Sequence, residues 1–220
     1  MSASPYQPPP PQALDPIFAD AQLVVVNKPA GLLSVPGRGE GMDDCMAHRV
    51  QAEFPDALIV HRLDMSTSGL LVLARGAAVH RALSIAFQSR AVSKRYVAVV
   101  AGRLAQASGE IDLPLICDWP NRPRQIVDRQ IGKPSLTRYR VLAYDAARDC
   151  SRVELEPITG RSHQLRVHLQ QLGHPILGDD LYAPEAIRTA SPRLLLHAEW
   201  LEIPHPASGL RQQFESTAPF

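Results

Sequence analysis

The segment from His61 to Gly69 holds the side chains best suited to chemistry. It reads His-Arg-Leu-Asp-Met-Ser-Thr-Ser-Gly and leads into an apolar run at residues 70–74. Asp64 is its one carboxylate, and His61 and Arg62 are basic neighbours. A partly desolvated carboxylate held by a cation can act as a nucleophile or in acid–base catalysis. An Asp-capped turn before a strand explains the same pattern equally well, so the residues alone leave both interpretations open.

Arg166 is a second polar residue in apolar surroundings. It lies within residues 162–172, whose spacing predicts a helix that ends at Gly173. A buried arginine needs an anionic partner, and Asp64 is a candidate for it. Composition alone favours the alternative, an arginine whose charged head reaches the surface.

Tyr96 follows Lys94 and Arg95 in a predicted strand. A tyrosine that points into a pocket can stack on a nucleic-acid base or exchange a proton, and basic neighbours suit phosphates. Without other information, a core tyrosine is the simpler interpretation.

Metal ions and nucleotide cofactors have no recognisable motif in this sequence. His163 and His168 point about 140° apart on a helix, unlike the i, i+4 pair of a zinc helix. The chain contains no Walker A motif, no dinucleotide-binding glycine motif and no G-x-S-x-G elbow. We therefore expect neither a metal nor a cofactor.

The elements that must position these residues are mostly strands. Apolar runs and alternation predict strands at residues 23–26, 58–60, 70–74, 94–100, 136–144, 152–156, 194–198 and 200–203. Helical spacing predicts helices at residues 42–54, 77–89 and 162–172. Residues 112–134 are rich in Pro and Arg, and they predict a long irregular loop. Helices do not alternate strictly with strands, which predicts an α+β fold with a mixed, mostly antiparallel sheet.

Composition bounds the class of protein. The chain has 220 residues, 45% of them hydrophobic, which suffices for one large core or a core with two lobes. Residues 1–16 are Pro-rich and predict a flexible tail. The sequence shows no secretory signal and no apolar run that could span a membrane. Cys45, Cys117 and Cys150 form no C-x-x-C pair, which fits a reducing, cytoplasmic setting.

Charge is unevenly distributed along the chain. Residues 1–60 contain seven acidic and three basic side chains, whereas residues 88–140 contain ten basic and four acidic ones. A basic stretch on a protein of net charge +1 can contact phosphates. An ordinary mixed surface accounts for it equally well.

Several blocks together resemble the RluA family of RNA pseudouridine synthases. They are residues 61–72, 94–98, 160–168, 173–179 and 195–198. The resemblance spans residues 17–206 and implies conversion of uridine to pseudouridine in RNA, with no cofactor and no metal. It also implies the pseudouridine synthase fold for residues 17–220, a central sheet in two lobes flanked by helices and loops.

The resemblance also implies roles for individual residues. Asp64 matches the catalytic aspartate, whose attack lets the glycosidic bond break. Arg166 matches the basic residue that pairs with it, and Tyr96 matches the tyrosine that stacks on the target base and accepts a proton. Arg62 matches the side chain that fills the space of the flipped base, and Leu196 is expected to line the pocket. The residues expected to contact RNA are Arg62, His61, Lys94 and Leu196.

The match is closest to the short, dual-specificity branch of that family. The resemblance implies ribosomal RNA and the tRNA anticodon stem-loop as partners, no membrane association, and a monomeric cytoplasmic enzyme. One alternative is a synthase of the same family that acts on a single RNA class. Others are an RNA-binding module without chemistry and a glycosidase-like hydrolase, which usually needs two carboxylates.

Overall fold

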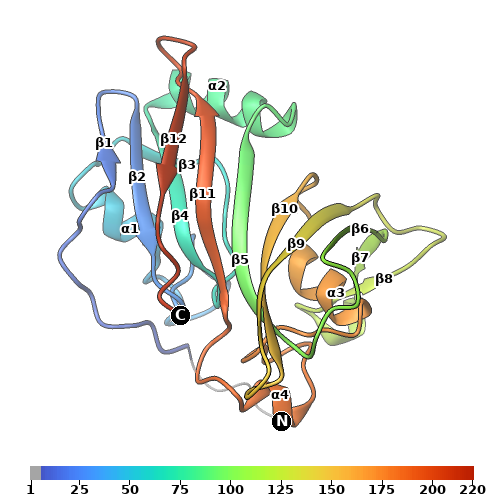
Figure 1. Ribbon diagram of the computed structural model, residues 1–220. Helices are drawn as coiled ribbons and strands as arrows, with labels where there is room; N and C mark the ends of the chain where they lie inside the picture. Colours follow the sequence, from blue (N-terminus) through green and yellow to red (C-terminus); the bar gives the residue numbers. More distant parts are fainter. Residues whose placement is uncertain (1–5) are drawn as a thin grey trace. The chain divides into compact units, whose positions relative to one another are not determined.

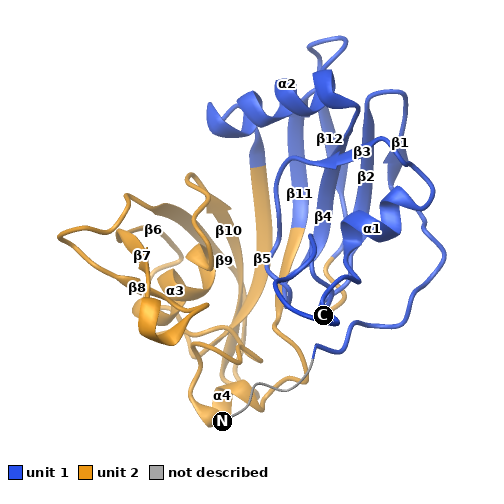
Figure 2. Cartoon of the chain, turned by 180° about the vertical axis from the view of Figure 1, so that it is seen from behind, with its two compact units in different colours: residues 1–93, 199–217 blue, residues 94–198, 218–220 orange. Residues whose placement is uncertain are grey.

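The structure, a computed structural model, describes residues 6–220, which form two compact units (Figure 2). Unit 1 takes in residues up to 93 and residues 199–217, and unit 2 takes in residues 94–198 and 218–220. The chain therefore leaves unit 1, builds nearly all of unit 2, and returns. The tail predicted at residues 1–16 begins with residues 1–5, which lie outside the described part.

Unit 1 is built on antiparallel strands (Figure 1). Strands β1 (Phe18–Ala19), β2 (Leu23–Lys28) and β4 (Ser68–Arg75) pair in this order, and β3 (Ala57–Ile59) pairs with β4. Strand β12 (Arg211–Glu215) pairs with residues 200–204 of β11 (Leu196–Pro204). Every residue of β4 except Arg75 is buried, so the strand that follows the Asp64 turn is a central element of this unit.

Two helices belong to unit 1. Helix α2 (Ala77–Gln88) places Val79 and Leu83 in one buried cluster with Val72 of β4. Helix α1 (Met46–Gln51) is shorter than the predicted helix at residues 42–54. The prediction is wrong before Met46, because Cys45 is extended and forms a parallel bridge to Leu33.

Unit 2 has its own antiparallel strands. Their order is β5 (Ser93–Ala101), β10 (Cys150–Pro157), β9 (Leu136–Asp145) and β6 (Ser108–Asp112). Helix α3 (Gln164–Gln171) contributes Leu165 and Leu169 to one buried cluster with Val153 and Leu155. Gly173 follows this helix with φ +88°, as its predicted stop requires. A short helix, α4 (Glu185–Arg188), comes later.

Residues 112–134 are more regular than predicted. Strands β7 (Leu115–Cys117) and β8 (Gln125–Val127) form an antiparallel hairpin, with a 3₁₀ turn, η1 (Trp119–Asn121), at its tip. Strands this short show no period in the sequence, which is why they were missed. The two predicted late strands are one strand, β11.

The predicted fold class is confirmed. The described strands belong mainly to one large, mostly antiparallel sheet, and the helices are few and do not alternate with the strands. No helix in residues 6–220 is long and apolar enough to cross a membrane.

Candidate active site

The backbone around Asp64 is fixed by hydrogen bonds within unit 1. The hydroxyl of buried Ser34 donates to the Leu63 carbonyl at 2.8 Å and accepts the Leu63 N–H at 3.1 Å. The Thr67 N–H donates to the Asp64 carbonyl at 3.1 Å and closes the turn. Asp64 is half-buried, so its carboxylate is carried on a backbone held on both sides.

Lys28 also hydrogen bonds to the turn that carries Asp64. Its side chain is 0% exposed, and its ammonium donates to the carbonyls of Pro29, Leu32 and Met65 at 2.8, 2.7 and 3.1 Å. A buried ammonium is tolerated only when its donors are satisfied. Lys28 is a residue that the sequence analysis gave no role. The two-residue period of β2, which puts Lys28 on the side of buried Val26, was the signal that could have found it.

Gly69 explains how the turn enters β4. It pairs with Lys28 across the sheet at φ +114°, a conformation that residues with a side chain rarely adopt. A glycine at this position therefore lets the chain pass from the Asp64 turn into β4 without backbone strain.

His61 and Arg62 have different environments at the start of the turn. The His61 ring stacks on Phe87, with 4.6 Å between ring centres and 20° between planes. Its Nε2 accepts the Val72 N–H at 3.0 Å, so this nitrogen carries no proton. Arg62 is exposed, as a side chain that enters RNA must be. The contacts with Phe87 and Val72 thus hold the His61 ring in place. The RNA contacts of His61 and Arg62 stay predictions.

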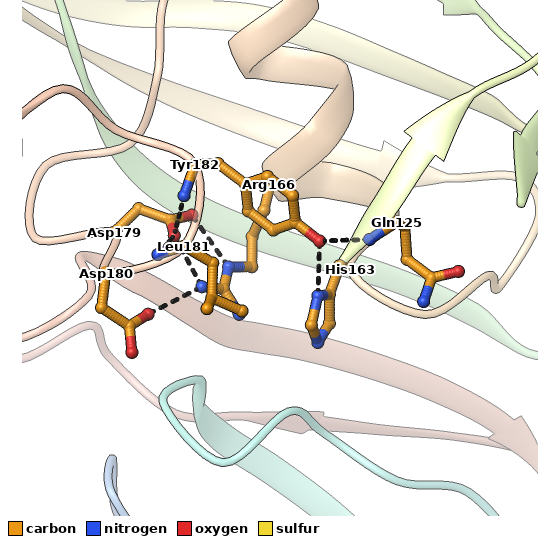
Figure 3. A network of polar contacts seen from close by, with 7 residues as sticks. All are labelled: Gln125, His163, Arg166, Asp179, Asp180, Leu181 and Tyr182. Atoms are coloured by element: carbon orange, nitrogen blue, oxygen red, sulfur yellow. Dashed lines mark hydrogen bonds and ion pairs between the residues drawn. The ribbon is translucent and has the colours of Figure 1, made fainter. Parts of the chain in front are cut away.

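Arg166 has a buried anionic partner within unit 2. The guanidinium binds Asp179 through two hydrogen bonds, Nε to Oδ2 at 2.8 Å and Nη2 to Oδ1 at 2.6 Å (Figure 3). Nη2 also reaches Asp180 at 3.0 Å. Arg166 is 2% exposed, so the surface alternative is wrong. Asp64 belongs to unit 1, and its pairing with Arg166 stays a prediction.

Asp179 is a residue that the sequence analysis gave no role. Its Oδ1 also accepts the N–H groups of Leu181 and Tyr182, at 3.0 and 3.1 Å (Figure 3). A carboxylate fixed by its own loop can orient an arginine more firmly than a freely rotating one. Its position in a block of the family resemblance, beside the need of Arg166 for an anion, was the available signal.

Tyr182 connects several parts of unit 2. Its hydroxyl accepts the Gln125 N–H at 2.8 Å and hydrogen bonds to Nδ1 of His163 at 2.7 Å (Figure 3). The guanidinium groups of Arg166 and Arg124 lie over its ring at 5.1 and 5.5 Å. One side chain therefore joins strand β8, the start of helix α3 and Arg166.

The other buried polar residues of α3 are also satisfied. The Gln164 amide donates to the Thr137 hydroxyl at 3.0 Å, and that hydroxyl lies 2.9 Å from Nδ1 of His168. Nε2 of His168 lies 3.1 Å from the Leu113 carbonyl and therefore carries the proton. Burial lowers the pKa of His168. These contacts anchor the helix that carries Arg166.

Lys94, Tyr96 and Leu196 lie in unit 2. Lys94 is half-buried, and its ammonium would be 3.8 Å from a Cβ at Gly160, in the loop before α3. Burial lowers the pKa of Lys94. Tyr96 packs, partly buried, on the core cluster that contains Leu196, which is 2% exposed. Their roles toward RNA stay predictions, and for Leu196 a base would have to reach a nearly buried side chain.

The described part of the chain contains no cluster of metal ligands. No group of three or more His, Cys, Asp or Glu side chains in residues 6–220 could hold an ion. His163 and His168 each hydrogen bond to a different residue, Tyr182 and Thr137.

Comparison with known proteins identifies the family. A family model described as RNA pseudouridylate synthase matches residues 22–171. The chain belongs to the RNA pseudouridylate synthase family. Its activity is therefore the isomerisation of uridine to pseudouridine in RNA, and the resemblance predicted from the sequence is confirmed.

Curated relatives and solved structures of this family agree. The dual-specificity RNA pseudouridine synthase RluA of Escherichia coli (strain K12) is 53% identical over 215 residues, 98% of each chain. The protein of the same name from Yersinia pestis is 53% identical over 93% of this chain and 98% of its own. Human RNA Pseudouridylate Synthase Domain Containing 1 has a TM-score of 0.81 at 31% identity, over 96% of this chain and 87% of its own.

Proposed function

We propose that this synthase modifies uridines in two RNA classes, ribosomal RNA and the anticodon stem-loop of tRNA. The observation that carries the proposal is the 53% identity, over 98% of both chains, to a synthase named dual-specificity. The two classes are those implied by the sequence resemblance. A monomeric enzyme in the cytoplasm belongs to the same proposal.

Asp64 is the nucleophile in this proposal. The isomerisation breaks the bond between ribose C1′ and uracil N1 and forms a bond from C1′ to C5. N1 gains a proton and C5 loses one, so the reaction needs no co-reactant. The fixed backbone on both sides of Asp64 supports the role, because a nucleophile held in place need not be ordered during the reaction.

Arg62 and Arg166 have complementary roles in the proposal. Flipping a uridine out of a stacked loop costs a few kcal/mol, and the exposed guanidinium of Arg62 offsets part of that cost by filling the vacated space. Arg166, fixed by Asp179, supplies positive charge where the reaction develops negative charge. Tyr96 stacks on the base and takes part in the late proton transfer.

The chemical part of the proposal is tested with RNA that carries tritium at uracil C5. Asp64→Asn is expected to fold like the wild type and to release no tritium, because only a carboxylate can attack. Asp180→Asn is the control, since its carboxylate is exposed. Tritium release by Asp64→Asn would refute the assignment, and free uracil as product would favour a hydrolase.

The substrate part is tested in cells with and without this protein. We expect pseudouridine to disappear from positions in both ribosomal RNA and tRNA when the protein is absent, and to return with the wild type but not with Asp64→Asn. Loss in one RNA class alone would replace the proposal by the single-class alternative.

A further inference from the structure

The tip of the hairpin formed by β7 and β8 exposes a tryptophan. Trp119 is 65% exposed, and the guanidinium of Arg122 lies 5.0 Å from the centre of its ring. Two isoleucines of the same segment, residues 112–134, are also exposed: Ile126 at 44% and Ile131 at 70%. Large apolar side chains gathered on one exposed segment indicate an interaction surface.

The tip is a preformed structure. The Asp118 N–H donates to the Arg124 carbonyl at 2.9 Å, and the Asn121 N–H donates to the Asp118 carbonyl at 3.0 Å. The Asn121 amide also donates to the Asp118 carboxylate at 2.9 Å. Trp119 therefore stands on a hydrogen-bonded turn, and a partner need not order the turn when it binds.

The body of unit 2 anchors the other side of the hairpin. Leu115 and Val127, which face each other across β7 and β8, pack in one cluster with Val167 and Tyr182. Because side chains alternate along a strand, Ile126 lies on the opposite, exposed face. One face of the hairpin packs on unit 2, and the other face is exposed, where a partner can bind it.

The charge of this segment favours a polyanion, rather than an apolar protein surface, as the binding partner. Residues 118–133 contain two acidic residues, Asp118 and Asp128, and four basic residues: Arg122, Arg124, Arg129 and Lys133. The Asp128 carboxylate accepts the N–H groups of Gln130 and Ile131 at 2.8 and 3.1 Å, and these bonds lower its pKa. Each of the two carboxylates is thus hydrogen bonded within its own loop.

We propose that Trp119, with Arg122, stacks on an unpaired base of the RNA substrate outside the catalytic pocket. A single strand offers both the phosphates that the basic side chains attract and the base faces that an indole stacks on. Paired bases do not expose those faces, so the platform selects loops over duplexes. The inference rests on RNA as the substrate, and it concerns affinity rather than the chemical step, which is assigned to Asp64.

The test compares dissociation constants for a synthetic tRNA anticodon stem-loop. Trp119→Ala is expected to weaken binding about fivefold to 150-fold, the range for removal of one stacked base. Trp119→Phe, which keeps a ring, should recover most of this loss. Leu210→Ala is the control, because Leu210 is an apolar residue of similar exposure, at 70%, in unit 1. The rate at saturating RNA should be unchanged in all three variants.

A second measurement does not depend on the folding of Trp119→Ala. The chain has two tryptophans, so Trp200→Phe leaves Trp119 as the single one. The fluorescence of Trp119 should then be quenched by the stem-loop but not by a duplex of equal length. Equal affinities of wild type and Trp119→Ala, or quenching by the duplex alone, would overturn the proposal. The proposal would also be overturned if the wild type formed a dimer that the Trp119→Ala substitution dissociates. Failure of the function proposed above would appear separately: pseudouridine would persist in tRNA of cells that lack the protein, or Asp64→Asn would still release tritium.

Discussion

Replacement of Asp179 by asparagine tests the central electrostatic feature of unit 2. The variant keeps the shape of the side chain but removes the charge that faces a guanidinium only 2% exposed. Breaking a buried pair on one side costs about 3–5 kcal/mol, because the remaining charge loses its buried counter-charge; the Asp180 carboxylate that stays near Arg166 is exposed. In a protein of this size, each kcal/mol lowers the melting temperature by about 2–4 °C. The expected decrease is therefore about 6–20 °C.

Asp180→Asn provides a matched control for this variant. Asp180 contacts the same Nη2 of Arg166 at 3.0 Å, but its side chain is 60% exposed. An exposed pair is worth less than about 1 kcal/mol, so the melting temperature should fall by less than about 4 °C. Tritium release should be reduced strongly in Asp179→Asn and little in Asp180→Asn. Equal melting temperatures of the two variants would refute the assignment of the buried pair as the support of Arg166.

Two further predictions concern residues that hold the site. Because burial lowers the pKa of His168, the unfolded state binds more protons around the usual value of about 6.5. The free energy of unfolding should therefore fall as the pH drops below that value, and a urea titration of His168→Gln should show less of this fall. Ser34→Ala removes both hydrogen bonds to Leu63 and should cost about 1–3 kcal/mol. It should also slow tritium release at saturating RNA, since the Asp64 turn loosens; an unchanged rate would show that Ser34 only stabilises the fold.

The sequence was most informative where local pattern and chemistry coincide. The turn around Asp64 and the helix around Arg166 were both placed correctly. The partner of Arg166 was not identified, because Asp179 lies on a separate loop that the fold brings to the helix. Lys28 was missed for a related reason: a lysine followed by Pro29 indicates a turn, and one of the carbonyls that its ammonium binds, that of Met65, is 37 residues away in sequence.

Boundaries and short elements were the least predictable parts of the fold. Helix α1 begins only at Met46, because Cys45 before it is extended and the Met46 N–H donates to the Leu33 carbonyl. The β7–β8 hairpin escaped prediction because its stability comes from packing on Val167 and Tyr182, a tertiary contact that no sequence period reports.

The order in which the two units are made has a consequence for biosynthesis. Unit 2 is almost continuous in sequence, whereas unit 1 requires both the first strands and residues 199–217. At about 5–20 residues per second, the ribosome needs roughly 5–20 s to add residues 94–198. During that interval Leu23 and Val72 lack Leu201 and Phe214, with which they later share one buried cluster. The first-made half of this protein is thus the last to finish folding, and chaperone binding to nascent chains should concentrate there.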